Sequence, residues 1–89
     1  MLKFRTTRKF EKDYKKCQKR GKEMNKLLSV MKHLVKELPL DEKYQDHPLT
    51  GTFKESRDCH IEPDWILIYR VSGEEIFFER TGTHSDIFK

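Results

Sequence analysis

Three histidines lie in the second half of this 89-residue chain, at His47, His60 and His84, and Asp64 and Arg80 are close to them in sequence. Imidazole is the only side chain whose unperturbed pKa lies between pH 5 and 8, so histidine can give or take a proton near neutrality. An arginine beside such groups can offset negative charge that develops during a reaction. These are the residue types that move protons around an anionic substrate.

Four interpretations of these residues compete. Three imidazoles and a carboxylate could bind zinc, but the spacing from His60 to Asp64 matches no familiar zinc pattern. A cysteine nucleophile is disfavoured, because Cys59 and His60 are strand neighbours whose side chains point to opposite faces. A third interpretation is purely structural, with histidines that cap loops. This role would account for one of the three histidines more easily than for all three. The fourth interpretation is RNA cleavage by a base and an acid, with the RNA's own 2′-hydroxyl as nucleophile.

Length and composition predict one small folded domain spanning residues 1–89. Charged residues make up 38% of the chain, but six Phe, three Tyr and one Trp argue against disorder. The formal charge is +4, and residues 1–20 hold nine Lys and Arg against two acidic residues. A basic surface favours a polyanionic partner such as nucleic acid, although lysine-rich helices also serve solubility alone.

Two further features bear on the compartment. No run of 18 apolar residues is present, and the first residues lack the apolar region of a secretory signal. Cys17 and Cys59 match no metal or redox spacing and are expected to be small buried side chains. We therefore expect a cytoplasmic protein without membrane contact.

The first half of the chain predicts a strand and two helices. Residues 2–5 alternate apolar and polar side chains, and Thr6 or Thr7 can cap a basic helix that ends near Gly21. A stripe of Met, Leu and Val at helical spacing covers residues 24–38 and predicts a second helix. Two amphipathic helices joined by a short turn form a helical hairpin.

The second half predicts three strands. Residues 39–52 show little periodicity, whereas residues 57–62, 65–71 and 75–80 are strand-like and are separated by short turns. The central segment of the three is apolar on both faces. The order βααβββ indicates an α+β fold in which the helical hairpin packs on one face of a twisted antiparallel sheet.

Strand pairing predicts that several polar side chains meet at one edge of the sheet. If the last two strands form a hairpin, the end of the second lies beside Trp65, at the start of the first. The residues brought to this edge are His60, Asp64, Arg80 and His84. The position of His47 does not follow from pairing, because its loop is long enough to reach this edge or to miss it.

Three segments of the chain carry recognisable motifs. They are KYQDHPLTG at residues 43–51, RDCHIEPDWILIY at 57–69 and ERTGTHS at 79–85. With these motifs the chain resembles the RelE/ParE superfamily of bacterial toxins, and within it the YafQ-type ribonuclease toxins. The similarity extends from about Phe10 to Phe88, although the N-terminal helices match only in pattern and charge. Cys59, Ser85 and Asp86 are the clearest departures.

The resemblance implies the toxin of a type II toxin–antitoxin system, with a fold like that of microbial ribonucleases. Such a toxin is expected to cleave messenger RNA in the ribosomal A site without a metal or cofactor, and to be neutralised by a cognate antitoxin. The catalytic residues implied are His47, His60, Asp64 and His84. The substrate-binding residues implied are Arg80, Phe88, Lys54 and Trp65.

The same resemblance suggests individual roles. His84 is expected to be the general acid, and Asp64 or His60 the base that takes the 2′-hydroxyl proton. His47 would assist the base, and Arg80 would stabilise the phosphorane. Two alternatives remain at this point: a ParE-like toxin that acts by binding DNA gyrase, and a non-catalytic regulator that binds RNA.

Overall fold

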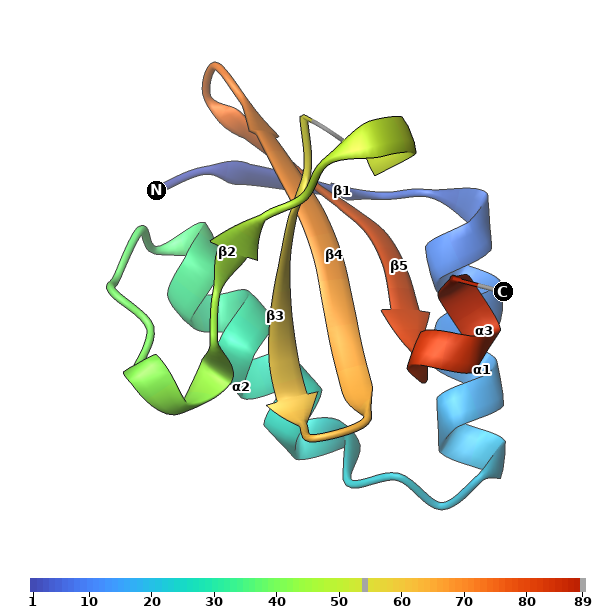
Figure 1. The fold of residues 1–89 in the computed structure, drawn as a ribbon. Helices are drawn as coiled ribbons and strands as arrows, with labels where there is room; N and C mark the ends of the chain where they lie inside the picture. The colour runs from blue at the N-terminus through green and yellow to red at the C-terminus, as the bar shows by residue number, and fades with distance from the viewer. Residues whose placement is uncertain (54, 89) are drawn as a thin grey trace.

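The computed structural model describes residues 1–53 and 55–88, which form a five-stranded sheet with the strand order β1-β5-β4-β3-β2. With η denoting a 3₁₀-helix, the elements are β1 (Lys3–Thr6), α1 (Arg8–Lys19), α2 (Met24–Val35), η1 (Glu42–Tyr44), β2 (His47–Pro48), η2 (Gly51–Phe53), β3 (Arg57–Glu62), β4 (Trp65–Ser72), β5 (Glu75–Gly82) and α3 (His84–Ile87). The helices α1 and α2 lie behind the sheet in Figure 1, and the face toward the viewer is free of long helices. No helix in the described ranges has the length and apolar character needed to cross a membrane.

The expected α+β class, the order βααβββ and the helical hairpin are confirmed. Two features of the sheet differ from the expectation: β1 pairs with β5 in parallel, so the sheet is mixed, and the short strand β2 adds a fifth strand beside β3. The consecutive strands β3, β4 and β5 form the expected antiparallel meander. The meander leaves the outer edge of β5 unpaired, and β1 occupies that edge.

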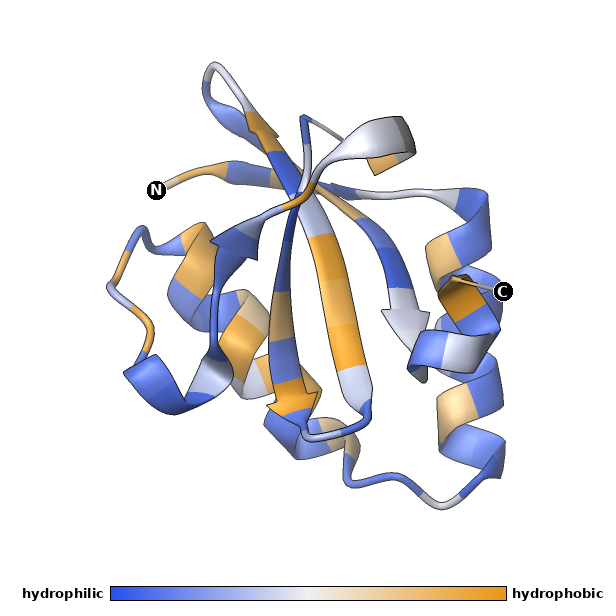
Figure 2. Cartoon of the chain, viewed as in Figure 1, coloured by the Kyte–Doolittle hydropathy of each residue, from blue (hydrophilic) through white to orange (hydrophobic). Residues whose placement is uncertain are grey.

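The core lies between the sheet and the two long helices. Phe10 and Cys17 of α1 and Leu27 and Val30 of α2 are buried against the side chains that β3, β4 and β5 present to this face. Apolar residues line the inner sides of the helices and run along β4, as Figure 2 shows. Cys17 and the second cysteine, Cys59, are both free and buried, as their sequence context predicts.

Trp65 belongs to this core. Its side chain is 0% exposed, and its indole Nε1–H donates to Thr81 Oγ1 at 2.9 Å. The Thr81 hydroxyl in turn donates to the backbone carbonyl of Ile66 at 2.9 Å. This chain of hydrogen bonds ties the start of β4 to the end of β5, and so supports the edge where the histidines were expected.

Trp65→Phe is expected to lower the free energy of unfolding by about 2 kcal/mol, because it removes a buried donor and leaves a small void. Urea denaturation followed by circular dichroism measures this change. Phe4→Leu, at a side chain that is 63% exposed, is the control and should leave the midpoint unchanged. Equal midpoints for Trp65→Phe and the native chain would show that the buried hydrogen bond contributes no net stability.

Candidate active site

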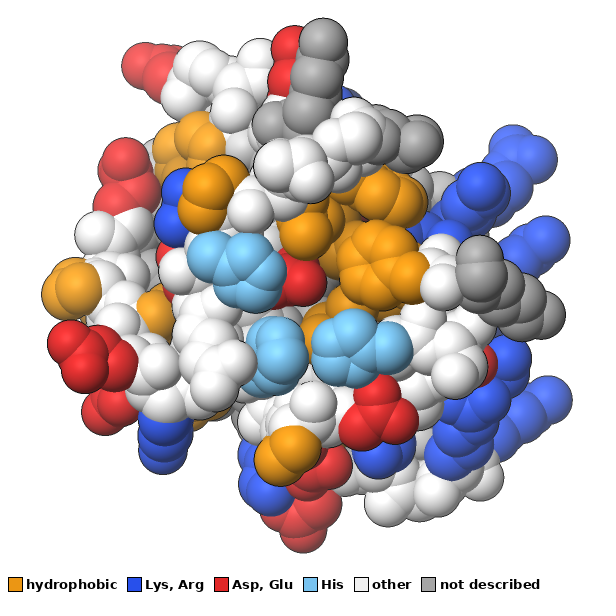
Figure 3. Space-filling view, in the orientation of Figure 1, with side chains coloured by type: hydrophobic (Ala, Val, Ile, Leu, Met, Phe, Trp, Pro, Cys, Tyr) orange, Lys and Arg blue, Asp and Glu red, His pale blue; other side chains and the backbone are white. Residues whose placement is uncertain are grey.

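The three histidines come from three different elements and form a row on the open face of the sheet. His47 lies on β2, His60 on β3 and His84 at the start of α3. The ring centroids of His47 and His60 are 6.4 Å apart, and those of His60 and His84 are 5.4 Å apart. Figure 3 shows the three imidazoles next to one another on the surface.

His47 reaches this row because of a strand that its sequence does not reveal. The two-residue strand β2 pairs antiparallel with β3, and the register places His47 opposite Asp58. The preceding residue, Asp46, anchors the segment by accepting hydrogen bonds from Tyr69 Oη at 2.8 Å and from Arg57 Nε at 3.2 Å. The previously open position of His47 is thus settled by pairing with β3.

His84 is oriented by Asp64. Its ring Nδ1 lies 2.8 Å from Asp64 Oδ1, and its backbone N–H donates to the same oxygen at 3.1 Å. The side-chain bond from His84, followed by the backbone bond, lowers the pKa of the Asp64 carboxyl. Because an ionised carboxylate only accepts, Nδ1 carries the proton and Nε2 is the nitrogen left for proton exchange with a ligand.

His47 faces a buried carboxylate. Its Nδ1 lies 2.7 Å from the backbone carbonyl of Gln45 and must therefore donate to it. Nε2 lies 3.2 Å from Asp58 Oδ1, an ion-pair distance without hydrogen-bond alignment. With Nδ1 already protonated, Nε2 bears a proton only in the imidazolium form. That cation is the form the Asp58 carboxylate attracts.

Asp58 was not among the residues expected in the site. Its side chain is buried, with a relative exposure of 3%, and its Oδ1 has no hydrogen-bond partner among the described residues. Burial raises the pKa of Asp58, and the charges of His47, His60 and His84 act in the opposite direction. Strand alternation does place Asp58 on the same face as His60, so the sequence contained the signal that would have found it.

Asp58→Asn is expected to raise the free energy of unfolding at neutral pH by about 1 kcal/mol, because it removes a desolvated carboxylate. The raised pKa means that ionised Asp58 opposes folding above that pKa and ceases to do so as the pH falls through it. The advantage of the variant should therefore shrink on acidification. Urea denaturation at several pH values measures it, with Glu55→Gln on the exposed surface as the control. A variant that is less stable at neutral pH would show that the carboxylate stabilises the fold through His47.

Arg80 lies at the expected edge, but its guanidinium is engaged. Nε is 2.7 Å from Asp13 Oδ2 and Nη2 is 3.3 Å from Asp13 Oδ1, so the side chain is held by α1. Two features of β5 bring Arg80 to α1. The register of β5 against β4 shifts by one residue at Glu79. Beyond Phe78, the outer edge of β5 faces α1 instead of β1. The Arg80 side chain is 19% exposed, so one part of it remains open to solvent.

The other three expected binding residues differ in their surroundings. Phe88 follows α3 and is 40% exposed, with its ring 6.3 Å from that of His84 and edge-on to Phe53 at 5.8 Å. Trp65 is fully buried in the core, so the structure does not support direct contact of its ring with a substrate. Lys54 lies outside the described residues.

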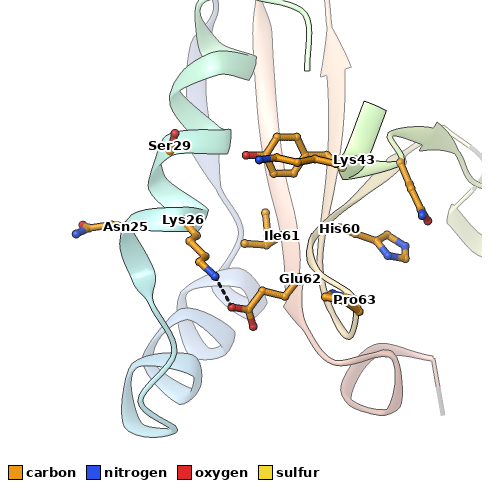
Figure 4. A pocket seen from close by; sticks show the side chains of 10 residues that line it. Asn25, Lys26, Ser29, Lys43, His60, Ile61, Glu62 and Pro63 are labelled. Atoms are coloured by element: carbon orange, nitrogen blue, oxygen red, sulfur yellow. Dashed lines mark hydrogen bonds and ion pairs between the residues drawn. The ribbon is translucent and has the colours of Figure 1, made fainter. Parts of the chain in front are cut away.

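A hollow adjoins His60 on the side away from His84. Its volume is about 770 Å³. It is lined by Asn25, Lys26, Ser29, Lys43, Tyr44, Gln45, His60, Ile61, Glu62 and Pro63. Figure 4 shows Lys26 reaching from α2 toward Glu62, and the ion pair between them measures 3.0 Å. A shift in register after His60 turns Glu62 toward α2, so the edge of β3 becomes a wall of the hollow.

The described residues contain no group of three or more His, Cys, Asp or Glu side chains arranged to hold a metal ion. Within the row, the groups that can exchange protons are the three imidazoles and the carboxylates of Asp58 and Asp64. Two imidazoles are each paired with a carboxylate, and a third, His60, lies between them. Such an arrangement can remove a proton at one point and deliver one at another.

Known proteins match this chain over most of its length. The family described as "Bacterial toxin of type II toxin-antitoxin system, YafQ" matches residues 2–89. The mRNA interferase toxin YafQ of Escherichia coli K12 is 52% identical over 80 residues, which cover 89% of this chain and 87% of that protein. The crystal structure of the E. coli DinJ-YafQ complex matches with a TM-score of 0.93 at 47% identity, covering 100% of both chains. A metal-bound toxin from Helicobacter pylori matches with a TM-score of 0.92 at 41% identity, covering 99% of this chain and 100% of that one. The chain therefore belongs to the YafQ family of type II toxin–antitoxin toxins.

Proposed function

We propose that this toxin is an endoribonuclease that cuts messenger RNA in the ribosomal A site, using the 2′-hydroxyl of the RNA as the nucleophile. The observation that carries the proposal is the row of three imidazoles, in which Asp64 fixes the tautomer of His84 at 2.8 Å. Relatives described as mRNA interferases support the same activity. The products are a 2′,3′-cyclic phosphate and a 5′-hydroxyl end.

In this scheme His84 is the general acid. Its Nδ1–H is committed to Asp64, so a proton on Nε2 can pass to the 5′-oxygen that leaves. His60, next in the row, is the base that takes the 2′-hydroxyl proton. The geometry favours His60 over Asp64 for this task, because Asp64 already accepts two hydrogen bonds from His84.

Positive charge at the phosphorus comes from two places. His47, whose Nε2 lies 3.2 Å from Asp58 Oδ1, is at one end of the row, 6.4 Å from His60 between ring centroids, and supplies positive charge when its imidazole is protonated. Arg80 lies at the other side, where its solvent-facing part can approach a phosphate oxygen while Asp13 keeps the side chain in place. Charge developing on the phosphorane is then stabilised by groups that the fold has already positioned.

The RNA strand crosses this face between two binding elements. The exposed ring of Phe88 provides a stacking surface for one base beside His84. The hollow on the other side of His60 has room for a neighbouring nucleotide and offers amide, hydroxyl and lysine groups to it. Exposed lysines of α1 supply a basic surface for ribosomal RNA, and Figure 3 shows Lys and Arg side chains gathered along one side of the row.

Brief expression of the chain alone tests the function. Growth and translation should stop, and primer extension should reveal new 5′ ends within translated messages. The site of action is the cytoplasm, where ribosomes engage these messages. Arrest with intact messages would contradict the proposal, and arrest accompanied by gyrase-dependent DNA breaks would favour the ParE-like alternative. RNA binding without cleavage would favour the regulator.

The neutralising partner is a cognate antitoxin, as the DinJ-YafQ complex of the E. coli relative suggests. The surplus of positive charge on the toxin favours an acidic, partly disordered segment that folds on binding. The affinity of the purified antitoxin is therefore expected to fall as ionic strength rises, because salt screens charges at the rim of the interface. Titration calorimetry over a series of salt concentrations measures the slope. An affinity that does not change with salt would mean that apolar contacts hold the pair.

A further inference from the structure

The short helix α3 carries His84 as its first residue, and Phe88 follows its last. A helix of four residues is far below the length that is stable in isolation. None of its residues is buried, so the hydrophobic core does not fix it. The position of His84 therefore depends on polar contacts made by α3.

One carboxylate makes most of these contacts. Asp86 Oδ2 lies 2.7 Å from Arg20 Nη1, and Asp86 Oδ1 lies 3.2 Å from Arg20 Nη2, so the two residues form a bidentate pair. Lys16 Nζ adds a third contact, at 3.4 Å from Oδ1. Lys16 lies in the last turn of α1 and Arg20 is its C-cap residue, so Asp86 links α3 to a helix of twelve residues that is anchored in the core.

The same carboxylate shapes the start of α3. Asp86 Oδ2 accepts the Thr83 N–H at 3.0 Å, while the Asp86 N–H donates to Thr83 Oγ1 at 3.1 Å, which completes a capping box. Gly82 permits this close approach, because a Cβ there would lie 2.9 Å from Oδ2. The bond from Arg20, with those from Thr83, lowers the pKa of Asp86, so the carboxylate stays ionised over the physiological range.

α3 is consequently held from two sides. On one side Asp64 accepts hydrogen bonds from the backbone and the ring of His84. On the other side Arg20 donates hydrogen bonds to Asp86. Asp86 does not turn toward His84, its near neighbour in sequence. Its effect on that histidine passes through the placement of the helix.

We propose that Arg20 and Asp86 are positioning residues that hold α3 so that His84 stays in hydrogen-bond contact with Asp64 and in line with His60. The inference rests on the proposed function, since it assigns Arg20 and Asp86 a part in the same cleavage reaction. A loosened α3 would misplace the general acid without disturbing the core.

Four variants separate this role from others. Arg20→Gln removes the ion pair and leaves the capping box intact, and Asp86→Asn removes the charge while retaining an oxygen for Thr83. Asp86→Glu keeps both the charge and the capping residue and is the rescue variant. Arg5→Gln is the matched control, because Arg5 forms an exposed ion pair with Glu75 on β5.

The first measurement is cleavage of ribosome-bound messenger RNA at varied substrate concentration. Arg20→Gln and Asp86→Asn are each expected to lower kcat about 10- to 100-fold with little change in KM. Asp86→Glu and Arg5→Gln should remain near the native rate. A rise in KM alone in Arg20→Gln would overturn the proposal, because it would indicate that Arg20 contacts the RNA and does not position α3.

The second measurement is an NMR pH titration of the Asp64 carboxyl group, which does not depend on RNA cleavage. The pKa of Asp64 is depressed by its bonds from His84, so it should rise toward its ordinary range in Arg20→Gln and Asp86→Asn only. If the pKa of Asp64 is unchanged in both variants, the proposal that Arg20 and Asp86 position His84 is wrong. If the native protein fails to cut RNA, the proposed function fails, while the titration still decides whether Arg20 and Asp86 position His84.

Discussion

A messenger RNA with a single 2′-deoxynucleotide at the scissile position is expected to remain uncut at that position. The 2′-hydroxyl is the nucleophile in the proposed reaction, and no arrangement of histidines can replace it. Binding to the programmed ribosome should be nearly unchanged, since Phe88 and the basic surface engage bases and phosphates. Primer extension on matched ribonucleotide and deoxynucleotide messages gives the comparison. A nearby position carrying the same substitution serves as the control.

Cutting of the deoxy-substituted message would point to an activated water or a bound metal ion. Chelation provides the complementary test, because a metal-independent reaction should proceed after the toxin is treated with chelator, provided that magnesium is restored for the ribosome. The question is pertinent because a related H. pylori toxin has been crystallised with bound metal. Loss of activity that only a transition metal restores would require His47, His60 and His84 to be reconsidered as ligands.

His84→Ala is expected to lower the rate of cleavage about 100- to 10,000-fold, the range typical for loss of a general acid or base. The protein should stay folded, because His84 is exposed and contributes nothing to the core. Single-turnover cleavage of ribosome-bound message, together with growth arrest on induction, measures the effect. His33→Ala is a matched histidine control, since His33 is an exposed residue of α2 whose ring nitrogen Nδ1 bonds with the Ser29 carbonyl of the same helix.

This variant also separates the candidate functions. A toxin that acted by binding gyrase would still arrest growth without His84, and a regulator that only bound RNA would show no cleavage to lose. Continued arrest by His84→Ala, at equal expression and with a native circular dichroism spectrum, would remove His84 from the reaction. Native activity in His33→Ala excludes a general effect of deleting a histidine.

Much of the fold could be predicted from the sequence because its longer elements repeat their apolar residues at a fixed period. The helical hairpin and the meander of β3, β4 and β5 are of this kind. β2 and α3 have two and four residues, too few for any period to be visible. The parallel partner of β1 was also hidden, because a lone strand of four residues does not indicate which edge it will join.

The site, like the fold, could be predicted where it depends on the longer strands and not where it depends on short elements. Hairpin geometry correctly brought His60, Asp64 and His84 together, because these residues lie on or next to strands whose pairing follows from short turns. His47 depended on β2 and could not be placed. Arg80 reached the expected edge, but its partner Asp13 depends on how α1 rotates against β5, which no local pattern states.

The alternation of side chains along the strands indicates on which face of the sheet Asp58 and Trp65 lie. Asp58 shares a strand face with His60, and the same alternation that placed one would have placed the other. Trp65 alternates with Leu67 and Tyr69, which face the core, so the same reasoning predicts a buried ring. For both residues the alternation along the strand is a more direct guide than the resemblance to a family.

The parallel pairing of β1 with β5 also determines when the sheet can close during synthesis of the chain. The first of these strands to leave the ribosome, β1, finds its partner only after β5 has been made, and α3 with His84 is made later still. Contacts so distant in sequence form late in folding, after the local hairpins. A nascent chain therefore cannot close its sheet until β5 has been made, and α3, which carries His84, is made after that. The row of three histidines is consequently among the last features of the fold to form.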